Sequence, residues 1–252
     1  MILSSTVIGE GPVIIILHGL FGEGKNWLSI AKLLSSSFEV HLLDQRNHGN
    51  SFYSVDQNYQ LMASDLNKYI KSKNITNFFL LGHSMGGKVA MEFALFYPKE
   101  LHKLIVVDIA PKLYKENYGN IFKGLQHVLL QAKSRKQAKE ILMDYTHDII
   151  LTNFLLKSLF FVDTKPKLKF NHLGIQDNIQ NMLMSPEKDT SFSGSTYFIC
   201  GEESNYVTKK DIPHIRKLFP NNHVITIPNA GHWPHFEQKQ IFLDCVQQIL
   251  CE

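Results

Sequence analysis

Short apolar runs alternate with longer amphipathic segments along most of this 252-residue chain, and this alternation limits the fold more than any other feature. Runs of four or five apolar residues are typical of strands buried on both faces, and the segments between them have the apolar spacing of helices. Such an alternation predicts a mostly parallel sheet with crossover helices on both faces. The six expected strands span residues 13–17, 40–43, 78–81, 104–107, 197–200 and 224–227.

The start and the middle of the chain depart from this rhythm. Residues 2–8 are expected to add one antiparallel strand at an edge of the sheet. Residues 112–193 contain several helical patterns and no convincing pair of strands. We therefore expect an α/β fold with a mostly parallel sheet of about seven strands. Residues 1–111 and 194–252 would form its core, and residues 112–193 a helical cap, or lid.

Some helix ends are visible in the sequence. Asn26 and Asn58 precede apolar helical patterns and are expected to cap them. The last helix is expected to begin near Pro234, at the first-turn position that proline favours, and to run to Cys251.

The composition narrows the classes of function. A net charge of +3 is too small to indicate nucleic-acid binding. Cys200, Cys245 and Cys251 lack the spacing of metal ligands and are expected to be reduced thiols. No Lys or Arg precedes Lys25, so the positively charged first region of a secretory signal is missing. The apolar run at 13–17 is far too short to span a bilayer. We therefore expect a cytoplasmic protein without stable membrane insertion, while its oligomeric state is not indicated.

The expected lid is basic, because residues 112–193 carry more Lys and Arg than Asp and Glu. A basic lid would favour an anionic substrate or leaving group, such as a coenzyme A thioester. Solvated lysines on helix faces would give the same surplus without any role in binding.

The segment from Gly82 to Lys88 admits two chemistries. Its first part reads G-x-S-x-G, the strained strand-to-helix turn that presents a serine nucleophile, here Ser84. The whole segment reads G-x-x-x-x-G-K, which is most of a phosphate-binding loop. That loop needs a hydroxyl after its lysine to hold magnesium, and the next residue is Val89. The nucleophile interpretation is therefore favoured.

Two backbone nitrogens are positioned to hold an oxyanion beside such a serine. Met85 follows the serine at the start of a helix. His18 and Gly19 follow the first parallel strand, and the loop there can donate a second N–H from Leu20, with Phe21 as the alternative. His18 itself is interpreted as a side chain that braces this loop.

A histidine-rich loop, NAGHWPHFE, follows the last strand at the same edge of the sheet. His232 is the expected general base, which would take the serine proton and pass it to the leaving group. His235 comes just after Pro234 and is expected to face away on the first helical turn. The two histidines lack an evident third metal ligand, so neither a metal nor a cofactor is expected.

The base also needs a carboxylate, and two places in the chain could supply it. The loop after the fifth of these strands contains Glu202 and Glu203, but Ser204 stands where an aspartate would be expected. Asp108 lies at the end of the strand that follows the serine helix, and a buried carboxylate there would require a partner. The chain order Ser, Asp, His favours Asp108.

The motifs LHGLFG, DQRNHGNS, GHSMGGK, VVDIAP and AGHWPH occur in this order over nearly the whole chain. Together they resemble the α/β-hydrolase superfamily, and more narrowly the small YbfF-type esterases and their animal abhydrolase relatives. The resemblance implies a cofactor-free Ser-His-Asp hydrolase of carboxylic esters, sometimes of thioesters. In the narrower group the acid lies in the VDIAP motif, which matches Asp108, and the oxyanion donors carry over to Leu20 and Met85.

The sequence therefore predicts a serine carboxylesterase that forms an acyl-serine intermediate on Ser84, with a small ester or thioester as substrate. Two alternatives remain open from the sequence. One is a receptor that binds a small ligand on a hydrolase scaffold without turnover. The other is a carbon–carbon bond hydrolase or an acyltransferase that uses the same residues.

Overall fold

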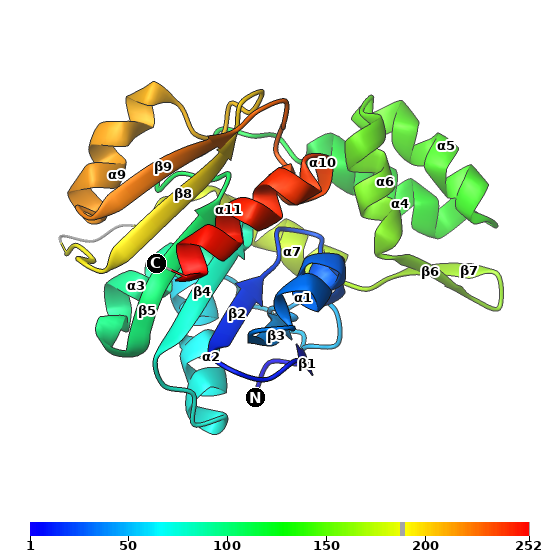
Figure 1. Ribbon diagram of the computed structural model, residues 1–252. Coiled ribbons are helices and arrows are strands. Elements are labelled where there is room, and N and C mark those ends of the chain that lie inside the picture. The colour runs from blue at the N-terminus through cyan, green and yellow to red at the C-terminus, as the bar shows by residue number, and fades with distance from the viewer. Residues whose placement is uncertain (187–189, 252) are drawn as a thin grey trace.

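The computed structural model describes residues 1–186 and 190–251, and a seven-stranded sheet runs through the centre of this part of the chain (Figure 1). The strand order across the sheet is β1-β3-β2-β4-β5-β8-β9. The strands are β1 (Ser5–Ile8), β2 (Val13–Leu17), β3 (Glu39–Leu43), β4 (Phe78–His83), β5 (Leu101–Val107), β8 (Ser195–Gly201) and β9 (Asn222–Ile227).

The pairing of the strands confirms the expected mostly parallel sheet. β1 pairs with β3 in the antiparallel direction, with Ser5 opposite Leu43, while every other pair in this sheet is parallel. Because parallel strands have their carboxyl ends at one edge, the loops after β2, β4, β5, β8 and β9 open on the same side of the molecule.

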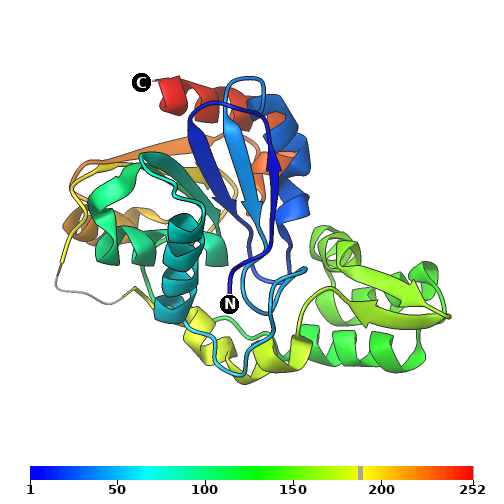
Figure 2. The same ribbon diagram turned by 90° about the horizontal axis from the view of Figure 1, so that it is seen from below.

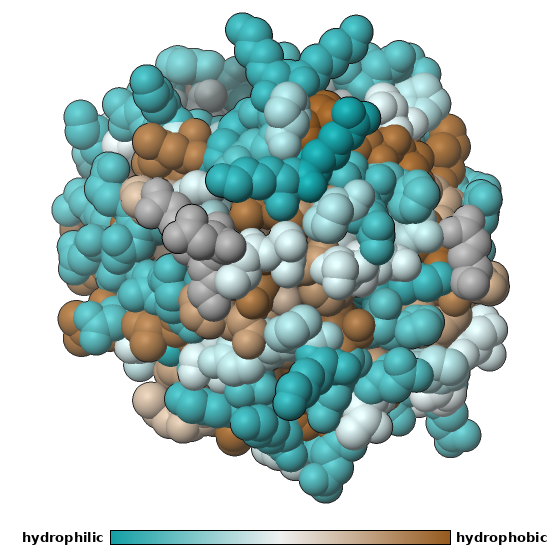
Figure 3. Space-filling view, turned by 90° about the vertical axis from the view of Figure 1, so that its left-hand side faces the viewer, coloured by the Kyte–Doolittle hydropathy of each residue, from teal (hydrophilic) through white to brown (hydrophobic). Residues whose placement is uncertain are grey.

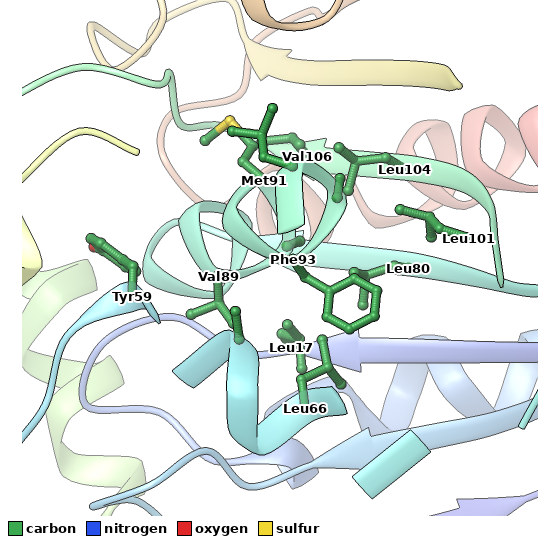
Figure 4. Close-up of a cluster of buried hydrophobic side chains, with 14 of the residues drawn as sticks. Leu17, Tyr59, Leu66, Leu80, Val89, Met91, Phe93, Leu101, Leu104 and Val106 are labelled. Atoms are coloured by element: carbon green, nitrogen blue, oxygen red, sulfur yellow. The ribbon is translucent and has the colours of Figure 1, made fainter. Parts of the chain in front are cut away.

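Alternate residues of the central strands pack into two separate cores, one on each face of the sheet. Ile15 and Leu17 belong to the core on the face covered by α2 (Tyr59–Ser72), α3 (Met85–Phe96) and α9 (Ile212–Leu218). Figure 4 shows the α3 part of this core. Ile14 and Ile16 point to the other face, where α1 (Leu28–Leu34) and α11 (Lys239–Cys251) cover them (Figure 2). The strands are therefore buried on both faces, which explains their nearly continuous apolar sequences.

The segment between β5 and β8 departs from the prediction in one respect. It contains the expected helices, but also an antiparallel hairpin of β6 (Leu159–Val162) and β7 (Lys165–Leu168), which corrects the expectation that this segment has no strand pair. Asp163 and Thr164 form the turn with positive φ angles, as short hairpin turns require. The sequence concealed this hairpin because its second strand is short, exposed and contains Pro166. The helices are α4 (Gly119–Gln131), α5 (Arg135–Thr146), α6 (Ile149–Lys157), α7 (His172–Asp177) and α8 (Ile179–Leu183).

Of the two expected asparagine caps, one is confirmed and one is wrong. Asn58 caps α2, since its side chain accepts a hydrogen bond from the Leu61 nitrogen. Asn26 does not cap α1. It lies inside the preceding 3-10 turn η1 (Gly24–Trp27), where its side chain accepts from the nitrogen of the capping residue, Glu23.

The last helical region begins at Pro234 and ends at Cys251, as expected, but it is divided in two because Gln238 adopts φ −129° and ψ 55°. The two parts are α10 (Pro234–Glu237) and α11. The backbone carbonyl of Asn229 accepts a hydrogen bond from the Gln238 side chain, so the break ties the helix to the loop that contains His232.

The surface seen in Figure 3 is mostly hydrophilic, with apolar side chains exposed in small separate patches. Among the described residues, no helix combines the length and the apolar character that crossing a bilayer would require.

Candidate active site

Ser84 occupies a strained turn between β4 and α3. Its φ of 52° and ψ of −119° lie outside the regions that residues with a side chain normally adopt. The turn is tight enough that a Cβ on Gly82 would lie 2.2 Å from the Gly86 carbonyl oxygen. A Cβ on Gly86 would lie 2.5 Å from the Leu17 carbonyl oxygen on the neighbouring strand. The glycines of the motif are therefore required by close packing, and the turn lifts the serine hydroxyl above the edge of the sheet.

His232 reaches this hydroxyl from the loop after β9. Its Nε2 lies 3.0 Å from Ser84 Oγ, and its Nδ1 lies 2.7 Å from Asp108 Oδ2. A carboxylate can only accept, so Nδ1 carries the proton and donates it to Asp108. Nε2 is then left to accept from the Ser84 hydroxyl, which is the tautomer that proton abstraction needs.

Asp108 lies directly after β5, where its φ is 49° and its side chain is fully buried. Besides the His232 N–H, the carboxylate accepts the Ser204 hydroxyl at 2.5 Å and the Gly201 nitrogen at 3.0 Å. Ser204, the residue found where sequence reasoning expected an aspartate, thus hydrogen-bonds the carboxylate of another strand. These three donors compensate the burial of the charge.

The competing glutamates lie elsewhere. Glu202 is exposed, and its side chain accepts from the Asn229 nitrogen at 3.0 Å. Glu203 is also exposed, at the rim of the cavity described below. In the described part of the chain, neither side chain is hydrogen-bonded to His232.

Three further residues hold His232, and sequence reasoning did not find them. The Tyr206 ring stacks on the imidazole, with 3.7 Å between centroids. The Nε2–H of His83 donates to the His232 carbonyl at 2.8 Å, and burial lowers the pKa of His83 to about 3, so this ring stays neutral. The Glu237 carboxylate accepts the Gly231 and Trp233 nitrogens on either side of His232. Only His83 had a signal in the sequence, namely its position beside the serine in the motif.

The two residues expected to donate to the oxyanion line the same small space as Ser84. Met85 is the first residue of α3, and Leu20 lies in the loop after β2. In the described ranges, neither of their backbone nitrogens is hydrogen-bonded. The alternative, Phe21, already donates its N–H to His48 Nε2 at 3.2 Å.

His18 and His235 both lie apart from the serine hydroxyl. His18 bridges its loop, since Nδ1–H donates to the Gly19 carbonyl while Nε2 accepts from the Gln45 nitrogen, and burial lowers its pKa to about 4. His235 stacks on Trp27 with 4.0 Å between ring centroids. Burial lowers the pKa of His235, so its ring is also neutral.

Lys88, the lysine of the phosphate-loop pattern, has a different use. Its ammonium group donates to the carbonyls of Lys112, Leu183 and Met184, which belong to the two ends of the segment between β5 and β8. All three N–H donors are occupied. Burial lowers the pKa of Lys88 to about 7.

A cavity of about 430 Å³ opens onto Ser84 and His232 between the sheet edge and helices α4 and α6. Its walls are largely apolar and aromatic, which suits a small organic ligand. A second, narrow space of about 20 Å³ also contacts Ser84 and adjoins the first. The lining common to both is Leu20, Ser84, Glu116, Tyr118 and Tyr206.

Residues 12–157 match the family model for the α/β-hydrolase fold, more than half of the chain. The chain belongs to the α/β-hydrolase family. Together with the seven-stranded sheet, this confirms the predicted fold class and the resemblance on which it rested.

Several relatives within the family are esterases or lipases. A putative esterase/lipase of Haemophilus influenzae is 38% identical over 95% of this chain and 83% of that protein. Esterase YbfF of Escherichia coli is 31% identical over 94% of this chain and 92% of that protein. The solved structure of a marine microorganism esterase is 40% identical and superimposes with a TM-score of 0.94 over 98% of both chains. This α/β hydrolase is therefore of the esterase/lipase type.

Proposed function

We propose that the protein is a serine carboxylesterase that hydrolyses small carboxylic esters or thioesters through an acyl-serine intermediate. One observation carries the proposal, namely the continuous hydrogen-bonded series from Ser84 Oγ through His232 to Asp108 Oδ2. Such a series activates a hydroxyl that is otherwise a weak nucleophile at neutral pH.

The reaction has two halves. Ser84 Oγ attacks the ester carbonyl while His232 Nε2 takes its proton, and the same proton then goes to the departing alcohol or thiol. Water next attacks the acyl-serine, with His232 again taking and returning a proton. In both halves Asp108 holds the Nδ1–H and stabilises the imidazolium, and the Leu20 and Met85 nitrogens donate to the oxyanion.

The segment 112–193 is proposed as the lid of this site. Residues of α4 and α6 wall the cavity opposite Ser84, namely Ile121, Ile150, Leu151 and Phe154. This wall limits the water around the reacting carbonyl, which strengthens the electrostatic stabilisation of the oxyanion.

Purified protein should release 4-nitrophenol from short-chain 4-nitrophenyl esters, and Ser84→Ala should abolish that release. Labelling with a serine-reactive fluorophosphonate should be lost in the same variant, and competition by esters and thioesters should reveal the preferred acyl chain. Turnover that survives in Ser84→Ala would refute the assignment of the nucleophile.

A further inference from the structure

The charged side chains that face the proposed substrate cavity are acidic. Four carboxylates line it, from Glu116, Asp148, Glu203 and Glu237. Among the described residues, no Lys or Arg lines this cavity. His83 cannot supply positive charge, since burial lowers its pKa to about 3. The basic surplus of residues 112–193 therefore does not extend to this cavity.

Three of these carboxylates should repel a bound anion only weakly, because each is either hydrogen-bonded to backbone nitrogens or exposed to water. Asp148 caps α6 by accepting from the Ile150 and Leu151 nitrogens. Glu237 accepts from the nitrogens that flank His232, and Glu203 is exposed at the rim, where water screens its charge. Glu116 is the remaining carboxylate, and it lines both spaces that contact Ser84.

Glu116 is held in one position by two aromatic hydroxyls. The O–H groups of Tyr118 and Tyr206 both donate to its Oε2, each at 2.9 Å. Tyr206 is the residue that stacks on His232, so the carboxylate is fixed relative to the proposed base. Burial raises the pKa of both tyrosines, so their hydroxyls remain donors at neutral pH. In the described part of the chain, Oε1 of Glu116 has no hydrogen-bond partner.

The cations closest to this arrangement are not free to bind a ligand anion. Lys88 lines the narrow space, but its three N–H groups already donate to backbone carbonyls. Lys157 lines a separate cavity, where its ammonium lies 4.5 Å from the centre of the Phe236 ring. A carboxylate placed beside Ser84 would thus meet the charge of Glu116 without a cation that could pair with it.

Building on the proposed esterase function, we propose that Glu116 is a specificity-determining residue that excludes negatively charged acyl groups and restricts the enzyme to esters that are uncharged near the scissile bond. The cavity of about 430 Å³ is the one with room for an acyl group, and Glu116 is part of its wall. Two like charges about 6 Å apart, at the effective dielectric constant of a partly buried site, correspond to about a ten- to hundredfold difference in kcat/KM.

The test compares two 4-nitrophenyl esters with the same adipoyl chain, 4-nitrophenyl hydrogen adipate, which carries a carboxylate, and 4-nitrophenyl methyl adipate, in which a methyl group makes that end neutral. The readout is the ratio of kcat/KM for the neutral ester to that for the anionic ester. Wild type should give a ratio of about ten or more, and Glu116→Gln should lower the ratio about tenfold. Glu140→Gln is the matched control, because Glu140 is exposed on α5 and does not line the cavity.

A wild-type ratio near one, an unchanged ratio in Glu116→Gln, or an equal shift in Glu140→Gln would each overturn the proposal. A second test needs no variant. The wild-type ratio should fall as the salt concentration rises, because salt screens the repulsion between the two carboxylates. A ratio independent of salt, together with an inactive Glu116→Gln, would also overturn it. If wild type hydrolysed neither ester, the proposed function itself would fail, and that result is distinct from hydrolysis without discrimination.

Discussion

Replacing Asp108 by asparagine isolates the part of the site that sequence reasoning found hardest to assign. In the wild type, the carboxylate accepts three hydrogen bonds, from His232 Nδ1, Ser204 Oγ and the Gly201 nitrogen. An asparagine keeps the size of the side chain, but its amide can offer an N–H toward His232. The imidazole would then carry its proton on Nε2, and this nitrogen could no longer accept the hydrogen bond from the Ser84 hydroxyl.

The expected cost follows from this change of tautomer. Loss of the base function and of the charge that stabilises the imidazolium should lower kcat by about four orders of magnitude, which corresponds to about 5 kcal/mol of transition-state stabilisation. KM should change little, because Asp108 is fully buried and does not line the cavity. The assay is 4-nitrophenyl ester hydrolysis, with circular dichroism to verify that the variant is folded.

Matched controls are available in the neighbouring loop. Glu202→Gln and Glu203→Gln make the same change of carboxylate to amide, and both should cost little, since neither side chain is hydrogen-bonded to His232 in the described part of the chain. Ser204→Asp should restore part of the activity to Asp108→Asn, because Ser204 Oγ lies 2.5 Å from the oxygen that accepts the His232 proton. Activity of Asp108→Asn within about tenfold of wild type, or a large loss in either glutamine variant, would refute the reasoning.

Two further predictions concern residues around the site. Tyr206→Ala should lower kcat about tenfold or more, because His232 loses the ring that stacks on it. Tyr206→Phe keeps the ring and should lower kcat much less. Equal losses of kcat in the two variants, measured by steady-state kinetics, would contradict a role for the stacking. Lys88→Met should alter the pH dependence of stability. The folded pKa of Lys88, about 7, lies below its ordinary value of 10.5, so between these values the unfolded chain holds the proton more tightly. As the pH rises through this window, the free energy of unfolding of wild type should therefore increase by about 1.4 kcal/mol per pH unit relative to Lys88→Met. The same difference should be lost as the pH falls to about 7. Urea unfolding of both proteins at pH 7 and pH 9 measures this, and a difference that does not change with pH would contradict it.

The parts of this molecule that the sequence predicted are those that local patterns determine. The apolar runs identified the central strands because burial on both faces leaves no room for polar residues. The glycines around Ser84 identified the turn because a Cβ at those positions would collide with backbone. Asp108 was favoured because the end of a buried strand is a costly place for a carboxylate without a partner.

What the sequence could not predict depends on contacts between distant segments. Tyr206 contacts His232 only once the sheet has brought the ends of β8 and β9 together. The hairpin of β6 and β7 was missed because Pro166 and the lysines of its second strand carry no apolar alternation. Asn26 was assigned to the wrong position because an asparagine suits both the cap of a helix and the third residue of a short turn. In either place its side chain can accept from a backbone nitrogen, here that of Glu23.

The three carbonyls bound by Lys88 have a consequence for how this enzyme could be re-engineered. They bring the two ends of the segment between β5 and β8 to one point on α3, and the Tyr114 nitrogen, which donates to the Leu183 carbonyl, joins those ends directly. Because one ammonium holds both ends, the middle of the segment can be varied while its two connections to the sheet are kept. A transplanted segment should be accepted when its ends present carbonyl oxygens to this ammonium and its middle replaces the hydrogen bonds that Ser158, Lys169 and Asn171 make with the loops after β2 and β3.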